Sequence, residues 1–312
     1  MNSRRVTVQI VAAVHNRRGI TLQCLRSISR FADERVEAGV VIVDDGSTDG
    51  TSDAIRRHFP QVDVVGGSGE LWYTEGTNVG IRRALEKRPD YVLIINDDQV
   101  FDVSCLSYLV ETAEANPNSV VGPLLLLWNS PHQLFQVSPR WQTMAGGWRH
   151  WYSQTVWTVP ASPWEVELIV GNCVLVPAVA FEAHGLMDSN RYPNFGDAEF
   201  TPRLRRVGYQ LLIDPRARVF CQPNSTPVRV RAKTIKGLIT DLIVDLRSVQ
   251  NLRRRFYASV DGAPTRLRGI VAFLVFLGRA VIGNSAETRI WGDAPEEPPL
   301  SKTYESKIID GG

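Results

Sequence analysis

The chain has 312 residues, of which 44% are hydrophobic and 22% are charged, and its formal net charge is +2 at pH 7. This composition is that of an ordinary folded protein; it excludes a disordered chain, and nothing in it predicts a nucleic-acid partner. The four cysteines stand far apart without a C-x-x-C pair, which argues against a disulfide framework or a structural zinc site and favours a reducing compartment: Cys24, Cys105, Cys173 and Cys221.

The first two thirds of the chain alternate apolar, β-branched runs with segments of helical spacing. The first run, Val6–Val14, alternates with polar residues and leads into His15 and Asn16, so it predicts a strand rather than a signal peptide. The alternation predicts an α/β fold with a mostly parallel sheet flanked by helices, in which ligands bind beyond the carboxyl ends of the strands. The later predicted strands are Val40–Val43, Val62–Val65, Tyr91–Ile95, Leu168–Val176 and Leu211–Ile213, and the predicted helices lie around Leu22–Phe31, Ala54–Phe59, Ile81–Leu85 and Leu106–Ala113.

The composition changes near Pro223–Pro227. Apolar residues then recur at steps of three and four from Ile235 to Phe256, which predicts one long amphipathic helix. Residues 231–279 hold ten Lys and Arg against three Asp and Glu, so this part of the chain is basic. We therefore expect a main domain over 1–225, a basic helical extension over 226–290 and a flexible tail over 291–312.

Two predicted strands end in paired carboxylates, Asp44–Asp45 and Asp97–Asp98. In a parallel sheet both pairs project into one crevice, where uncompensated carboxylates are costly, so something positive should meet them. Mg²⁺ and Mn²⁺ bind carboxylate oxygens together with substrate phosphates, so a divalent cation that holds a diphosphate would suit this edge. A second interpretation of the first pair is a turn followed by a helix cap, which Ser47–Asp49 would suit.

The glycines of EGTNVGI, residues 75–81, open a predicted helix. Its free N–H groups, with Asn78 beside them, could approach an anionic ligand. The preceding glycine cluster lacks the Lys-Ser/Thr of a P-loop and does not follow the first strand, so it predicts no more than a turn.

Several of these segments together resemble family 2 glycosyltransferases. The segments are VAAVHNR, VIVDDGSTDGT, LWYTEGTNVGI, LIINDDQVF, GNCVLVPAVAFEAHGLMD and YPNFGDAEFTPRLRRVGYQLLIDPRARVF, and the resemblance covers roughly residues 5–222. The chain looks most similar to the non-processive, rhamnosyltransferase-like branch of these inverting enzymes, which have the GT-A fold. The resemblance implies transfer of a sugar from a nucleotide-diphosphate sugar to a saccharide or lipid-linked saccharide, in cell-surface polysaccharide or glycolipid assembly.

The resemblance also implies roles for individual residues. Asp197 falls at the position of the general base that takes the acceptor's proton, and Asp98 at that of the metal ligand, with Mg²⁺ or Mn²⁺ as the cofactor. From periodicity alone, Asp197 would equally suit a helix N-cap, and the two interpretations do not exclude each other. The remaining positions are His15, Asp44, Asn78, Asn96 and Asp97 for the nucleotide sugar, and Gly171, Asn172 and Glu199 for the acceptor.

Two features leave alternatives open. Cys221 stands where the family often has a metal-binding His; a thiol is a poor ligand for Mg²⁺, so we expect it to be a packed free cysteine. The aromatic stretch Trp141–Trp157 suits either ordinary packing or a platform on which an acceptor sugar stacks.

The basic extension also has two interpretations. It suits either a surface that rests on anionic lipid or a helical pair packed on the main domain or in a homodimer. The apolar run from Gly269 contains Arg279 and is too short to span a bilayer, so we expect a cytoplasmic protein, peripheral on the membrane if the lipid interpretation holds. The alternative functions are a sugar nucleotidyltransferase, disfavoured because HNRRGIT lacks a Gly-rich basic loop, and a non-catalytic sugar-nucleotide-binding module, disfavoured by the presence of both Asp98 and Asp197.

Overall fold

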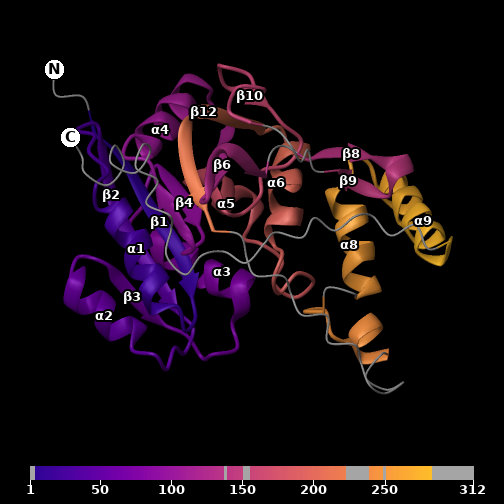
Figure 1. The fold of residues 1–312 in the computed structure, drawn as a ribbon, viewed down its shortest axis with the longest axis horizontal. Coiled ribbons are helices and arrows are strands. Elements are labelled where there is room, and N and C mark those ends of the chain that lie inside the picture. The colour runs from indigo at the N-terminus through magenta and orange to yellow at the C-terminus, as the bar shows by residue number, and fades with distance from the viewer. Residues whose placement is uncertain (1–3, 137–138, 150–154, 223–238, 249–250, 283–312) are drawn as a thin grey trace.

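A computed structural model describes residues 4–136, 139–149, 155–222, 239–248 and 251–282 (Figure 1). One ten-stranded sheet forms the centre, and β8 Arg140–Gln142 with β9 Gly147–Arg149 forms a separate hairpin. The strands of the central sheet are β1 Val6–Val14, β2 Val36–Asp44, β3 Asp63–Gly66, β4 Tyr91–Ile95, β5 Gln99–Phe101, β6 Ser119–Leu127, β7 Ser130–Gln136, β10 Trp164–Glu165, β11 Cys173–Pro177 and β12 Gln210–Cys221.

The strand order along the sheet is β10-β12-β6-β11-β4-β1-β2-β3, with β5 paired to β12 and β7 to β6. Strands β4, β1, β2 and β3 are parallel, as the alternating pattern predicts, and β12 is parallel to β6. Strand β11 runs antiparallel to both of its neighbours, so the sheet is mixed. The predicted strand over Leu168–Val176 begins only at Cys173, and the sequence analysis did not assign the fully buried β6.

Helices cover both faces of the sheet. Along β1 the side chains alternate, so that Ile10 packs with α1, α2 and α4 while Val11 packs with α3, α5 and α6. The continuous apolar runs of the strands follow from this burial on both faces. The bounds are α1 Arg18–Ile28, α2 Thr51–His58, α3 Trp72–Leu85, α4 Cys105–Ala115, α5 Ala178–His184 and α6 Asp197–Arg206.

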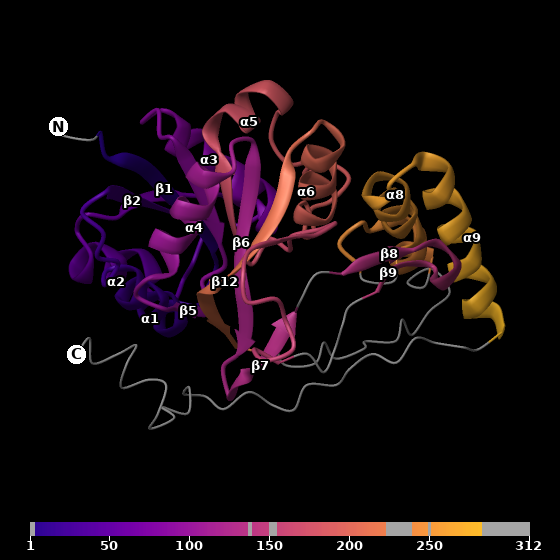
Figure 2. The ribbon, with the colours of Figure 1, turned by 90° about the horizontal axis from the view of Figure 1, so that it is seen from above.

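The C-terminal helices, α8 Leu252–Gly262 and α9 Arg266–Ile282, pack on each other at one end of the sheet. Figure 2 shows α8 beside α6, and the β8–β9 hairpin with the short helix η1 Thr143–Ala145 against α9. Among the described residues, no helix is both long and apolar enough to cross a membrane.

The prediction of one helix from Ile235 to Phe256 is wrong. A short helix, η2 Thr240–Val244, ends at Asp245, whose backbone is extended and whose carboxylate accepts from the Arg247 N–H at 3.0 Å. Asn251 then caps α8, accepting from the Arg254 N–H at 2.9 Å. These side chains bond local backbone groups and so end and restart the helix, which overrides the amphipathic period. The start of the predicted helix at 235–238, residues 249–250 and the predicted tail at 291–312 lie outside the described residues.

Candidate active site

The polar ends of β1, β2 and β4 lie together at one edge of the sheet. Val14, at the end of β1, is in register with Asp44, at the end of β2, and Val11 is in register with Ile94 of β4. His15, which follows β1, brings its Nδ1 to 2.6 Å from the Asp45 carbonyl oxygen. The parallel pairing therefore gathers the acidic strand ends into one place, as predicted.

Arg17, at the start of α1, bridges the two carboxylates that follow β4. Its guanidinium donates to Asp97 Oδ1 at 2.9 Å and to Asp98 Oδ2 at 3.0 Å. The side chains of Asp97 and Asp98 are 3% and 9% exposed, while that of Arg17 is 37% exposed. The positive group that these buried carboxylates need is thus supplied by the chain itself, from a residue that the sequence analysis did not assign. Its position directly after HN in the first strand's loop is the signal that could have identified it.

The pKa of Asp97 is raised to about 6. Burial raises it most, Arg17 lowers it, the nearby Asp98 raises it, and the Thr21 hydroxyl, which donates at 2.8 Å, lowers it. Loss of hydration outweighs the two stabilising contacts because the carboxylate lies deep below the strand end. An additional cation at this edge would favour the ionised form of Asp97.

The pair after β2 has two separate roles. Asp44 accepts from the Ser47 N–H at 3.0 Å and from the Ser52 hydroxyl, so it both closes the turn and anchors α2. Asp45 accepts three N–H groups of the glycine-containing loop, from Gly69 at 2.7 Å, Leu71 at 2.9 Å and Trp72 at 3.1 Å. Asp45, which the sequence analysis left unassigned, therefore holds the loop before α3 against the end of β2.

Asp197 is the first residue of α6 and is half-buried. Its Oδ2 accepts from the Gly171 N–H at 2.9 Å. Burial raises the pKa of Asp197, and the N–H groups of Gly171 and of the first α6 residues oppose that rise. A carboxylate with a raised pKa and partial exposure has the properties of a general base.

Tyr73 links Asp197 to the carboxylates of β4. Its hydroxyl donates to the Gly171 carbonyl at 3.1 Å, and a Cβ on Gly171 would lie 2.5 Å from that hydroxyl and 2.7 Å from Asp197 Cβ. Burial raises the pKa of Tyr73, and the charges of Asp197 and Asp98 raise it further. One phenol therefore lies close to both acidic groups, and Gly171 is required because no side chain fits between Tyr73 and Asp197.

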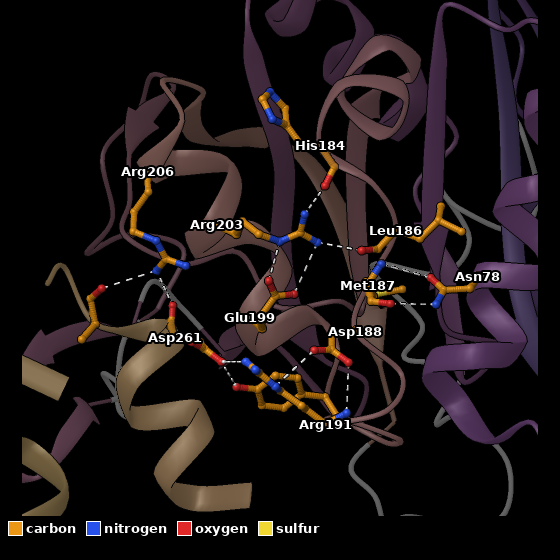
Figure 3. Close-up of polar contacts among 12 residues, drawn as sticks. Asn78, His184, Leu186, Met187, Asp188, Arg191, Glu199, Arg203, Arg206 and Asp261 are labelled. Carbon is orange, nitrogen blue, oxygen red and sulfur yellow. Dashed lines mark hydrogen bonds and ion pairs between the residues drawn. The ribbon is translucent and has the colours of Figure 1, made fainter. Parts of the chain in front are cut away.

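Glu199 and Asn78 lie in a different network from the one predicted (Figure 3). Glu199 is buried and forms an ion pair with Arg203, which also donates to the carbonyls of His184 and Leu186. Asn78 is 2% exposed and bonds both the carbonyl and the N–H of Met187, at 2.9 and 3.2 Å. These contacts fix the segment after α5, so both side chains already have partners within the protein.

Cys221 lies beside this edge as a buried thiol. Gln99 Nε2 donates to its Sγ at 3.6 Å, and burial, followed by the charge of Asp98, raises the pKa of the thiol well above its ordinary value. A neutral thiol is no ligand for a hard cation, which supports the interpretation of a packed cysteine. Asn172 lies at the same edge of the sheet, because its backbone carbonyl accepts from the N–H of Asn96, the residue after β4, at 2.9 Å.

The donor set fits a divalent cation only in part. In the part of the chain that the structure describes, no group of three or more His, Cys, Asp or Glu side chains is arranged to hold a metal ion. Mg²⁺ and Mn²⁺ are commonly bound through one or two carboxylates together with substrate phosphates, and Asp98 with Asp97 satisfies that smaller requirement. A cation here would replace Arg17 on one of these carboxylates.

The aromatic stretch packs against the C-terminal helices in its described part. Trp141 and Trp148 form an edge-to-face pair with ring centroids 5.2 Å apart, and the Trp148 indole lies against Gly262 of α8. Trp157 is 75% exposed and stacks on His132 at 5.7 Å. Trp141 and Trp148 thus have packing partners within the protein, and residues 150–154 of the stretch lie outside the described residues.

Comparisons with known proteins agree with this geometry. Residues 9–152 match the model described as glycosyl transferase family 2. Among curated proteins, the N-acetylglucosaminyl-diphospho-decaprenol L-rhamnosyltransferases of two Mycobacterium tuberculosis strains are 25% identical over 218 residues, which cover 62% of this chain and 69% of theirs.

Solved structures share the fold. S. aureus TarS 1–349 in complex with UDP-GlcNAc superposes with a TM-score of 0.56 at 13% identity, over 89% of this chain and 73% of that one. GalNAc-T7 with UDP, GalNAc and Mn²⁺ gives a TM-score of 0.58 at 15% identity, over 71% of this chain and 44% of that one. The chain thus spans less than half the length of GalNAc-T7. These neighbours confirm the predicted GT-A fold.

Proposed function

Since residues 9–152 match the glycosyl transferase family 2 model and the chain has a GT-A fold, we propose that it is an inverting glycosyltransferase that uses a nucleotide-diphosphate sugar. The observation that carries the proposal is a backbone link between the two acidic groups: Gly171 donates its N–H to Asp197, and the next residue, Asn172, accepts from the N–H of Asn96, which directly precedes Asp97 and Asp98. One acidic group is thus available for the acceptor and another for the donor's diphosphate. The 1–225 domain would hold the whole catalytic site.

In the proposed reaction the acceptor hydroxyl attacks the anomeric carbon from the face opposite the leaving nucleoside diphosphate. Asp197 removes the hydroxyl proton as the bond forms, and the Gly171 N–H fixes the carboxylate for that transfer. The raised pKa of Asp197 makes it a stronger base than an ordinary carboxylate. Asp97 and Asp98 would hold Mg²⁺ or Mn²⁺, whose chemistry is to neutralise charge on the departing diphosphate.

The donor side is formed by the other strand ends. We propose that Asp44, with His15 beside it, contacts the base or ribose, and that Asn96 and Asp97 lie along the ribose and diphosphate. The half-buried Asn96 and the exposed His15 leave room for such contacts. Asn78 is not part of this set, because Met187 occupies its amide.

For the acceptor we propose a lipid-linked saccharide that carries a diphosphate. Support comes from the curated relatives, whose acceptor is N-acetylglucosaminyl-diphospho-decaprenol. Asn172, held beside the end of β4, and Gly171, next to Asp197, lie where an acceptor sugar would meet the donor.

We also propose that the chain contacts an anionic membrane, where a lipid-linked acceptor would lie, through the outer face of α9. Leu267, Ile270 and Leu274 are 70%, 41% and 59% exposed and follow one another at helical spacing. Arg266 and Arg268 flank this stripe. An apolar stripe with arginines beside it is the pattern of a helix that lies in the lipid headgroup region. The competing proposal is that a second copy of the chain covers the stripe.

The function is tested by incubating the full chain with a panel of UDP-, dTDP- and GDP-sugars and Mn²⁺, with and without a prenyl-diphosphate-linked GlcNAc. Transfer with inversion at the anomeric carbon supports the proposal. Formation of a nucleotide sugar from a sugar phosphate and a nucleoside triphosphate would instead identify a nucleotidyltransferase. Binding without turnover would identify a non-catalytic module.

A further inference from the structure

Arg254, in the first turn of α8, is a partly buried cation that forms no ion pair with any residue the structure describes. Its side chain is half-buried, and its guanidinium contacts the Phe195 ring at 4.5 Å and the Arg247 carbonyl at 3.5 Å. Burial, followed by the charge of Arg255, lowers the pKa of Arg254 to about 10, and among the described residues no carboxylate offsets this. A cation that has lost hydration without gaining an anion is costly, so the site favours an anionic ligand.

Arg254 contacts the turn that leads to the proposed base, Asp197. Phe195, on which the guanidinium rests, lies two residues before Asp197, in the turn that leads into α6. The same turn is bonded to the start of α3, because Thr74 N–H donates to the Pro193 carbonyl at 2.9 Å and Gly196 N–H to the Thr74 hydroxyl at 3.1 Å. Arg254 therefore contacts a turn that is tied to the start of α3 and that carries Asp197 at its end.

An exposed apolar surface adjoins this cation. Trp72 and Phe195 are each 42% exposed, although both are large and apolar. Arg247 lies over the Trp72 ring at 4.9 Å, but its charge is taken up by Asp245 at 2.8 Å. The segment that leads to Arg247 adds three further exposed apolar side chains, at 50%, 49% and 62%: Ile239, Ile243 and Val244.

We propose that Arg254 binds the diphosphate of a prenyl-diphosphate-linked acceptor, with the prenyl chain running over Trp72, Phe195 and the exposed apolar residues of η2. The inference rests on the proposed glycosyltransferase function and deepens it by assigning the acceptor's charged group to a residue outside the family 2 domain. An anion with an apolar tail matches a lone guanidinium bordered by an apolar surface, whereas the donor's diphosphate is proposed to lie with its cation at Asp97 and Asp98. Charge complementarity thus favours the acceptor.

The test measures binding of farnesyl diphosphate, inorganic pyrophosphate and farnesol by calorimetry to the full chain saturated with UDP and Mn²⁺. We expect farnesyl diphosphate to bind most tightly, Arg254→Gln to weaken it about tenfold to a hundredfold, and Arg254→Lys to restore part of the loss. The matched control is Arg253→Gln, an exposed arginine of the same helix turn, which should leave the affinity unchanged. Circular dichroism of each variant verifies that α8 is intact.

Other outcomes would overturn the inference. Equal affinity of wild type and Arg254→Gln for farnesyl diphosphate, or an equal loss in Arg253→Gln, excludes a specific site. Equal binding of farnesol shows that the apolar surface acts alone, and weaker UDP binding in Arg254→Gln assigns the residue to the donor. Donor hydrolysis by the wild type, measured separately, tells failure of this inference apart from failure of the proposed function.

Discussion

The guanidinium of Arg17 donates to Asp98 Oδ2 at 3.0 Å, so the carboxylate predicted to hold a divalent cation already has a cation beside it. The same group donates to Asp97 Oδ1 at 2.9 Å. The two buried carboxylates are therefore neutralised in part before any ligand binds. A metal that enters with the donor would compete with Arg17 for these two carboxylates.

Arg17→Gln should lower the stability of the ligand-free chain by about 1–3 kcal/mol, because it leaves the carboxylate pair without its cation. Mn²⁺ should then stabilise this variant more than the wild type, since the metal no longer competes with the guanidinium. Thermal unfolding with and without Mn²⁺ measures both effects. Arg18→Gln, an exposed neighbour whose N–H rather than guanidinium bonds Asp49, is the matched control. An equal Mn²⁺ effect on wild type and Arg17→Gln would show that the two cations do not compete.

Asp197→Asn should reduce kcat by about 10²- to 10⁴-fold, which is the usual contribution of a general base. Donor affinity should hardly change, since the side chain lies on the acceptor side and Asn still accepts from the Gly171 N–H. Steady-state kinetics and UDP titration separate the two quantities. Turnover near the wild-type rate would remove Asp197 from the mechanism.

The pH dependence of kcat should show an acid limb above the range of an ordinary carboxyl, whose pKa is about 3.9. Because burial raises the pKa of Asp197, the carboxylate becomes protonated and inactive as the pH falls through that raised value. At saturating donor, Asp97 and Asp98 stay bound to the donor's diphosphate and its cation. Their titration then contributes little to the pH profile of kcat. A limb near pH 4 would mean that the base has an unshifted pKa.

Asp97→Asn should stabilise the ligand-free fold at pH 7.5 while it impairs donor use. The folded-state pKa of Asp97 is raised to about 6, so the native state holds this proton more tightly than the unfolded chain, and stability is lost as the pH rises through that value. The variant avoids that loss, with a gain of up to about 3 kcal/mol that shrinks as the pH falls from about 6 to about 4. Urea unfolding at pH 7.5 and at about pH 4, with the exposed Asp53→Asn as control, measures the gain. A gain that is independent of pH would point to packing instead of ionisation.

The core of the fold could be predicted from local patterns, because each strand buried on both faces leaves a continuous apolar run. Tyr91–Ile95 was placed correctly for this reason, and the parallel register of β1, β2 and β4 then gathers the acidic strand ends. The helix break at Asp245 could not be predicted from the apolar period, since a side chain that bonds its own backbone leaves that period intact.

The candidate site likewise has one part that local sequence patterns predict and another that they do not. The amino-acid sequence by itself determined which carboxylates end the strands, Asp44, Asp97 and Asp98, and that Asp197 opens a helix, because strand ends and helix starts are local properties of the chain. Only the tertiary structure decided which cation meets Asp97 and Asp98, that Tyr73 meets Gly171 beside Asp197, and which partners Asn78 and Glu199 have within the protein. These partners are far apart in sequence, and a contact between distant residues depends on the packing of helices on the sheet, which no local pattern encodes.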